Sequence, residues 1–246
     1  MTEKTTKAAA QSEPRELTGE QIELESSTKV VEILIESLTP ILPHQFGEKA
    51  RREMARKHAK VEKQGKEVRD PVQDAVDALY FIGEKPEVPK SMRNLMLEDH
   101  TDLVALPFLQ GAAFGMPPAA FKHAVCRAGK TSDFKMVDLA TTLYVEAHGT
   151  WNGRELVALE YDGIPMMRCD PVTVGNTSDL RYRCELHPWK TRLKVRFNSG
   201  FLSIRQIGKL FIDAGDLIGI ADWRPEKFGT HGRFRVVRIA EMKRTA

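Results

Sequence analysis

Apolar and polar residues alternate most regularly near the two ends of the chain. The segment at residues 28–43 (TKVVEILIESLTPILP) has Val31, Ile33 and Ile35 at every second position near its start. Successive side chains of a β-strand point to opposite faces, so this alternation predicts a strand with one face in a core. Residues 192–197 (RLKVRF) alternate as strictly, and residues 233–239 (RFRVVRI) form a final apolar segment. We expect strands at both.

Two segments show helical spacing instead. In residues 115–130 (GMPPAAFKHAVCRAGK) two prolines precede a helix that ends at Gly129, and its inward residues are Phe121, Ala124 and Val125. In residues 201–220 (FLSIRQIGKLFIDAGDLIGI) Ser203 is a candidate N-cap. The apolar face of this second helix consists of Ile204, Ile207, Leu210 and Phe211.

Between these two helices, the segments TTLYVEAHG, RELVALEY and MMRCDPVTV read as strands separated by turn residues. The order along the chain is therefore strand, insertion, helix, several strands, helix, loop, strand. This order predicts an α+β protein in which the helices pack on one face of an antiparallel sheet.

Two segments lack the pattern of a packed element. Residues 1–26 are polar and low in complexity, so we expect a disordered tail. Residues 47–70 hold nine basic and five acidic residues and almost nothing apolar. They favour helix but have no face to bury, and we expect either an exposed helix or a flexible arm outside the core.

Composition excludes several classes of protein. The chain is 41% hydrophobic and 29% charged, as in soluble globular proteins, and no apolar run is long enough to span a membrane. The N-terminus lacks the apolar segment of a signal peptide, which indicates an intracellular protein. The three cysteines are far apart and form no CxxC pair, so we expect buried thiols rather than a disulfide framework or a zinc ribbon.

The net charge of +3 is unevenly distributed. Residues 181–246 contain 15 Lys and Arg against 6 Asp and Glu, a net charge of +9, so residues 1–180 carry −6. Such an asymmetry indicates a surface that binds a polyanion, and a solvated basic face is the competing interpretation.

The basic residues of this region are interleaved with aromatic ones. Arg192, Lys194 and Arg196 project to one side of the predicted strand, where like charges repel one another. Cations can track phosphates while exposed rings stack on bases, as single-stranded nucleic acid requires. The candidate binding residues just upstream are Arg183, Trp189 and Lys190. Alternatively, this is an edge strand kept soluble by charge, with Trp189 in the core.

Residues 219–236 (GIADWRPEKFGTHGRFRV) form a long cationic loop between apolar segments. We expect Gly229 and Gly232 to let the backbone approach a phosphate, and Trp223 to stack on a base. The basic residues expected to grip the anion are Arg224, Lys227 and Arg233. The alternative is that Trp223 anchors the loop in the core.

Three segments resemble the RAMP superfamily, which includes the backbone subunits of CRISPR complexes: LTPILPHQFG after the first strand, GMPPAAFKHAV at the first helix, and the glycine-rich loop. Residues 116–125 partly match the family's IPGSSLKGALR-like segment, although Pro and Ala stand where the family has Gly and Ser. The chain also resembles uncharacterised phage and prophage proteins that end in GDWRP and GRF motifs.

The RAMP resemblance implies an RRM/ferredoxin-like antiparallel sheet with helices on one face. It places a single RRM-like domain over residues 27–246, with a large insertion at about 45–110 after the first strand. It further implies binding of single-stranded DNA or RNA along a groove, often as a homo-oligomer or filament. The likeness to phage proteins, together with the N-terminus, leads us to expect a cytoplasmic protein of a bacterial host cell.

Function is accordingly expected to be non-enzymatic binding of single-stranded nucleic acid, with no cofactor and no membrane partner. The seven histidines form no HxH or HxxxH pair, which disfavours a metal site. Some RAMP members cleave RNA without metal by using a histidine, and His44 would be that acid–base here. Two alternatives therefore stay open. One is a RAMP-type endoribonuclease in which His44 is the acid–base, although His44 could equally be an ordinary histidine of a surface loop. The other is a structural or assembly protein that binds an acidic partner.

Overall fold

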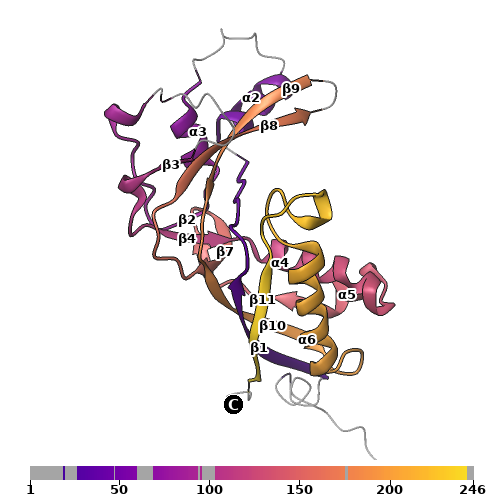
Figure 1. The fold of residues 1–246 in the computed structure, drawn as a ribbon. Coiled ribbons are helices and arrows are strands. Elements are labelled where there is room, and N and C mark those ends of the chain that lie inside the picture. The colour runs from indigo at the N-terminus through magenta and orange to yellow at the C-terminus, as the bar shows by residue number, and fades with distance from the viewer. Residues whose placement is uncertain are drawn as a thin grey trace, which may run out of the picture.

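A computed structural model describes residues 19, 27–46, 48–59, 69–93, 95, 103–174 and 177–242. The predicted disordered tail at 1–26, apart from Gly19, lies outside the described residues, and so does the part of the predicted arm at 60–68. Within the described part the chain is an α+β protein with antiparallel sheets (Figure 1).

The first sheet contains the three strands predicted from alternation. Its strands are β1 (Thr28–Ser37), β5 (Leu143–Val145), β10 (Lys190–Asn198) and β11 (Phe234–Glu241). They lie in the order β11-β1-β10-β5, and every neighbouring pair is antiparallel. Strands from the two ends of the chain are thus hydrogen-bonded neighbours, because β1 lies between β10 and β11 (Figure 1).

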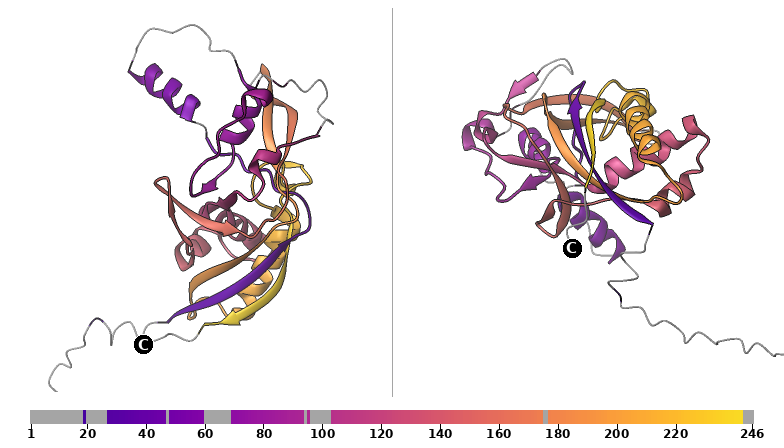
Figure 2. Two further views of the ribbon diagram at one scale, coloured as in Figure 1. Left: turned by 90° about the vertical axis from the view of Figure 1, so that its left-hand side faces the viewer. Right: turned by 90° about the horizontal axis from the view of Figure 1, so that it is seen from below.

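Helices α4 (Pro118–Ala128), α5 (Met136–Thr142) and α6 (Ile204–Asp213) gather on one face of this sheet (Figures 1 and 2). Both predicted helices are confirmed. Ser203 caps α6 through a capping box with Gln206, and Gly129 is the C-cap of α4. The apolar residues that the sheet turns towards the helices are buried, among them Val31, Ile33, Ile35, Leu193, Val195 and Phe197.

The remaining strands form two further sheets. One contains β2 (Phe81–Ile82), β4 (Ala113–Met116), β6 (Gly149–Trp151) and β7 (Arg154–Leu159) in the order β2-β4-β7-β6. The other contains β3 (Leu103–Ala105), β8 (Met166–Val174) and β9 (Thr177–Glu185) in the order β3-β8-β9. The expectation of one sheet is therefore wrong: the predicted strands RELVALEY and MMRCDPVTV form, but apart from a single bridge between Glu160 and Lys190 they pair outside the sheet of β1.

Helix α3 (Pro71–Asp77) packs against the long β8–β9 hairpin, and α2 (Glu48–His58) lies at the same end of the molecule (Figures 1 and 2). In α3, Asp70 caps the first turn and Val72, Ala75 and Val76 are buried. In α2, all the side chains that the structure describes are exposed. The segment predicted to have no face to bury is thus an exposed helix over residues 48–58.

Single-turn helices complete the described chain: η1 (Lys90–Met92), η2 (Pro107–Leu109), η3 (Gly129–Ser132), the π-helical η4 (Ala214–Ile218) and η5 (Pro225–Lys227). Cys126, Cys169 and Cys184 are buried free thiols, as predicted. None of the helices in the described ranges is both long enough and apolar enough to cross a bilayer.

Candidate functional site

The cations of β10 lie on the face of the first sheet that the helices leave uncovered. Exposed and buried residues alternate along the whole strand, as the sequence predicts. The side chains of Lys190, Arg192 and Arg196 are 50%, 57% and 56% exposed. Tyr144 of β5, itself 48% exposed, is the register partner of Arg196. An exposed aromatic ring therefore borders the row of cations.

Carboxylates of the same surface partly neutralise this row. Glu146 accepts from Arg196 at 2.8 Å, and Glu160 lies 3.3 Å from the Lys190 ammonium and 3.9 Å from Arg192. Lys194 has no ion pair within the described part of the chain. Carboxylates of the protein itself thus partly compensate the repulsion between these cations. Lys194 and Arg192, which have the weakest contacts with carboxylates, are the cations most available to bind an anion.

Arg183 and Trp189 do not belong to this surface. They are 3% and 2% exposed, so the expectation that they contact nucleic acid is wrong. Trp189 packs edge-on against Phe234, at 6.5 Å between ring centroids. It is a core residue, as the alternative interpretation held. Arg183 lies inside because two carboxylates compensate its charge, as described below.

The glycines of the 219–233 loop pack against the loop itself. A Cβ at Gly229 would lie 1.8 Å from the Trp223 carbonyl oxygen, and one at Gly232 would lie 1.9 Å from that of Ile220. The amide of Gly229 donates to the Arg224 carbonyl, and that of Gly232 donates to the Pro40 carbonyl. Neither amide is available to a phosphate, so this part of the predicted anion loop is wrong.

The cations of the loop are also engaged. Arg224 donates to Glu226 at 2.8 Å and to the Ala221 carbonyl at 2.9 Å, while Arg233 donates to Asp216 at 3.0 Å. Glu226 also forms an ion pair with Arg127, at 2.9 Å between Nε and Oε1, which holds η5 beside α4. Because α4 covers the other face of the sheet, η5 and the exposed cations of β10 lie on different sides of the sheet. Lys227, the last residue of η5, is exposed, and so is Phe228, which follows it and is 102% exposed.

Trp223 is half-exposed rather than buried in the core. Its side chain is stacked on His231 at 5.6 Å between ring centroids, and the guanidinium of Arg168 lies 4.8 Å from its ring centre. With 40% of its surface exposed, it can still offer an edge to a ligand. Its backbone has a positive φ of 57°, which a bulky residue adopts only when the surrounding structure imposes it.

A cleft of about 350 Å³ forms where the loop meets the segment after β1. Its polar lining includes His44, His123, Asp222 and Arg224, beside the first turn of α4. The Nδ1 atom of His44 lies 2.6 Å from Oδ2 of Asp222. A carboxylate at this distance fixes the orientation and tautomer of an imidazole, as in His–Asp pairs that transfer protons.

The electrostatics of the cleft favour charged Asp222 and neutral His123. Burial alone would raise the pKa of Asp222, but the hydrogen bond from His44 and the charges of His44 and Arg183 together hold it below its ordinary value of 3.8. Burial is the largest cause that lowers the pKa of His123 below 6.5; the charge of Glu226 opposes it, and those of Arg127, Arg224 and Lys227 act in the same direction as burial. One histidine thus faces a carboxylate, and the other stays uncharged at neutral pH.

Behind the cleft, a chain of ion pairs runs into the β8–β9 hairpin. Arg183 donates to Asp222 at 2.7 Å and to Asp170 at 2.6 Å, and Arg168 donates to the other side of Asp170 at 2.8–3.0 Å. Arg168 also pairs with Glu185, which lies 3.1 Å from Nε2 of His231. Asp170 is fully buried, and its ion pairs with Arg168 and Arg183 compensate the cost of removing these charges from water.

Sequence reasoning missed Asp222, His123 and the carboxylates of β8 and β9. Asp222 is adjacent to Trp223 in the 219–236 loop, where the basic and aromatic residues indicate anion binding and a carboxylate does not. Its partners His44 and Arg183 are 178 and 39 residues away. No local spacing could have indicated those pairs.

No protein-family model matches the sequence, and no curated protein matches it. Among the described residues, no group of three or more His, Cys, Asp or Glu side chains is placed to hold a metal ion.

Proposed function

We propose that the protein binds single-stranded nucleic acid on the uncovered face of the first sheet. The observation that carries the proposal is the exposed row Lys190, Arg192, Lys194 and Arg196 with Tyr144 beside it. Cations along one strand can follow a phosphate backbone, and an exposed ring can stack on any base. Trp223, next to η5 and not on this face, is a separate candidate stacking surface.

The topology of this sheet supports an RRM/ferredoxin-like assignment. In chain order its strands are β1, β5, β10 and β11, with α4 and α5 before the second and α6 before the fourth. This is the β-α-β-β-α-β pattern of ferredoxin-like folds. The strands of the other two sheets would then belong to two insertions, one after β1 and one between β5 and β10, and each of these sheets contains strands from both insertions. In RRM domains, the sheet face opposite the helices is the one that holds RNA.

Binding is tested by titrating labelled single-stranded DNA, single-stranded RNA and duplex DNA at several salt concentrations. We expect single strands to bind more tightly than duplex and affinity to fall as salt rises. We also propose assembly of identical subunits along the strand, which predicts that the number of bound chains grows with oligonucleotide length. Binding of an acidic polypeptide but of no nucleic acid would instead support the assembly-protein alternative.

The His44–Asp222 pair favours a second candidate function, cleavage of RNA without a metal. In this proposal His44 removes the proton from a ribose 2′-hydroxyl, whose oxygen then attacks the adjacent phosphorus. The bond from phosphorus to the 5′-oxygen breaks, that oxygen takes a proton, and a 2′,3′-cyclic phosphate is left. Asp222 would hold the imidazole in position and stabilise its protonated form.

Incubating 3′-labelled RNA with the protein in EDTA distinguishes the two functions. Cleavage that is lost in His44→Ala, and absent on a DNA strand of the same sequence, would support the nuclease. Intact RNA with undiminished binding would support binding alone. His58→Ala is the matched control, because His58 is an exposed histidine of α2, away from the cleft lining.

A further inference from the structure

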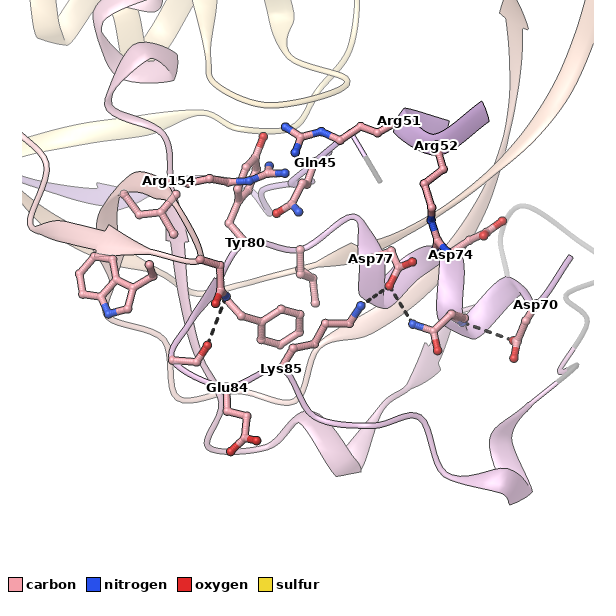
Figure 3. Close-up of a pocket in the computed structure, with 17 residues that line it drawn as sticks. Gln45, Arg51, Arg52, Asp70, Asp74, Asp77, Tyr80, Glu84, Lys85 and Arg154 are labelled. Carbon is pink, nitrogen blue, oxygen red and sulfur yellow. Dashed lines mark hydrogen bonds and ion pairs between the residues drawn. The ribbon is translucent and has the colours of Figure 1, made fainter. Parts of the chain in front are cut away.

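A larger cavity, of about 700 Å³, lies between α2, α3 and the β6–β7 hairpin (Figure 3). Its walls carry four basic residues, Arg51, Arg52, Lys85 and Arg154, and four acidic ones, Asp70, Asp74, Asp77 and Glu84. The formal charges cancel, but the two signs are not mixed evenly through the cavity.

Three of the four acidic residues, Asp70, Asp74 and Asp77, belong to α3 or its N-cap, and all three are already engaged. Asp70 accepts from the backbone amides of residues 72 and 73 as the N-cap of α3. Asp74 accepts from Arg69 at 2.5 Å, and Asp77 pairs with Lys85 and accepts from Gln73 (Figure 3). The α3 end of the cavity is therefore neutralised by its own contacts.

The opposite end holds two guanidinium groups that pair with no carboxylate among the residues that the structure describes. Arg51 of α2 and Arg154 of β7 extend towards the same region around Tyr80 (Figure 3). Arg154 lies 5.9 Å from the centre of the Tyr80 ring, and the charges of both arginines act on the pKa of the Tyr80 hydroxyl, which burial raises. Neither arginine has an ion pair within the described part of the chain. Two cations that face one region without an anion repel each other, a cost that a bound anion would remove.

The same end of the cavity has the other groups that a nucleotide needs. Gln45, turned so that its amide donates to the Leu79 carbonyl, accepts from Arg154 at 3.3 Å and steadies that guanidinium. The rings of Tyr80 and Trp151 line the cavity and are only partly buried, so a base has an aromatic face to stack on. Paired guanidiniums bind the oxygens of phosphate through several parallel hydrogen bonds.

We propose that this cavity binds one nucleotide unit, with its phosphate between Arg51 and Arg154 and its base against Tyr80 or Trp151. The proposal rests on the proposed function in one respect, that the nucleotide belongs to a nucleic-acid strand. Tyr80 lines both this cavity and the cleft of His44. His44 lines the cleft, and the next residue, Gln45, lines the cavity. A strand anchored here would therefore have its next nucleotide beside His44 and Asp222.

Calorimetric titration with uridine 5′-monophosphate, uridine and inorganic phosphate tests the cavity without any need for strand binding. We expect the monophosphate to bind the full-length protein, and Arg51→Gln and Arg154→Gln each to weaken it at least tenfold. Arg205→Gln is the control, because Arg205 is an exposed arginine on α6, outside the lining of this cavity. Thermal melting of each variant verifies that it is folded, and Arg51, which is exposed, is the substitution least able to disturb folding.

Unchanged affinity for the monophosphate in Arg51→Gln and Arg154→Gln, or no binding to the unmodified protein at millimolar concentration, would overturn the proposal. Inorganic phosphate that binds as tightly as the nucleotide would overturn the stacking of the base. The sheet is tested separately by Lys194→Gln. Loss of oligonucleotide binding in that variant, with monophosphate binding retained, would show that the sheet and the cavity are independent sites. If no oligonucleotide binds the unmodified protein, the proposed function is rejected, and the result for the cavity is unaffected.

Discussion

His44 and Asp222 are 178 residues apart in the sequence, and their side chains meet at 2.6 Å. One follows β1 and the other precedes β11, and these two strands are neighbours in the first sheet. The pair therefore exists only when the C-terminal strand has joined the sheet. It also closes the cleft at the point where Arg183 connects it to the buried Asp170.

Replacing Asp222 by Asn should destabilise the protein. Arg183, whose side chain is 4% exposed, would lose one of its two carboxylates and keep only Asp170. A buried charged donor that loses its partner costs about 1–3 kcal/mol. Urea denaturation should show this loss in Asp222→Asn and under about 1 kcal/mol in Asp216→Asn, whose ion pair with Arg233 is exposed. Equal values for the two variants would contradict the importance of the buried chain.

The free energy of unfolding should fall in acid, because two carboxyl groups have lower pKa values in the folded protein than in the unfolded chain. The folded-state pKa values of Asp222 and Glu185 lie below the ordinary 3.8 and 4.5, because hydrogen bonds and cations outweigh the effect of burial. The stability they contribute is complete above those ordinary values and is lost as the pH falls through the lower folded-state values. The lowered pKa of His123 adds a decline that begins near its ordinary 6.5.

Urea denaturation at several pH values measures this dependence. We expect the free energy of unfolding to fall as the pH drops from 7 to 3. In Asp222→Asn the slope below pH 4.5 should be shallower, since one titrating carboxyl is gone. Identical slopes in the two proteins would show that Asp222 does not titrate as described.

Gly232 should tolerate alanine far less well than Gly153 does. Both have positive φ, 70° and 72°, so each substitution carries the backbone cost of about 1–2 kcal/mol for a left-handed L-residue. Only at Gly232 would the new Cβ also collide with a carbonyl oxygen, that of Ile220, whereas nothing lies within 4 Å at Gly153. Thermal melting should show a much larger loss for Gly232→Ala, and equal losses would mean that the loop can relax away from β11.

Alanine substitutions of Trp189 and Trp223 should have different effects, the first on stability and the second mainly on binding. Trp189→Ala, in the core, should cost about 3–5 kcal/mol of stability. Trp223→Ala removes a half-exposed ring and its contact with Arg168, worth roughly 0.5–2 kcal/mol. If Trp223 stacks on a base, its loss should also weaken oligonucleotide binding by about ten- to a hundredfold. Melting and binding measured on the same variant decide between the roles, and full affinity in a folded Trp223→Ala would remove it from the binding surface.

Replacing Arg192, Lys194 and Arg196 together by Gln should flatten the salt dependence of binding. Each lost phosphate contact lowers the slope of log affinity against log salt by roughly 0.7 for a single strand. The matched control replaces three exposed cations on or near the helices, Lys130, Lys135 and Arg205, by Gln. An unchanged slope in the β10 variant would exclude this face as the binding surface.

Local patterns predicted the elements whose residues interact with near neighbours. The alternation around Ile33 and Val195 sufficed for β1 and β10, because burial of one strand face is visible at every second residue. Ser203 and Gly129 marked helix ends for the same reason, since a cap acts within a few residues. The sequence could not show that β7 and β8 pair outside the first sheet, because alternation indicates a strand and says nothing about its partner.

The sequence by itself determined the strands and helices with the most regular patterns, such as β1, β10, α4 and α6, and that the basic residues concentrate in the last quarter of the chain. Only the tertiary structure decided what each charge does. Arg183 and Arg192 both look like phosphate contacts in the sequence, yet one is enclosed between Asp170 and Asp222 while the other faces solvent. The physical reason is that a side chain's chemistry fixes what it can bind, whereas its partner depends on which distant residues the fold brings within about 3 Å.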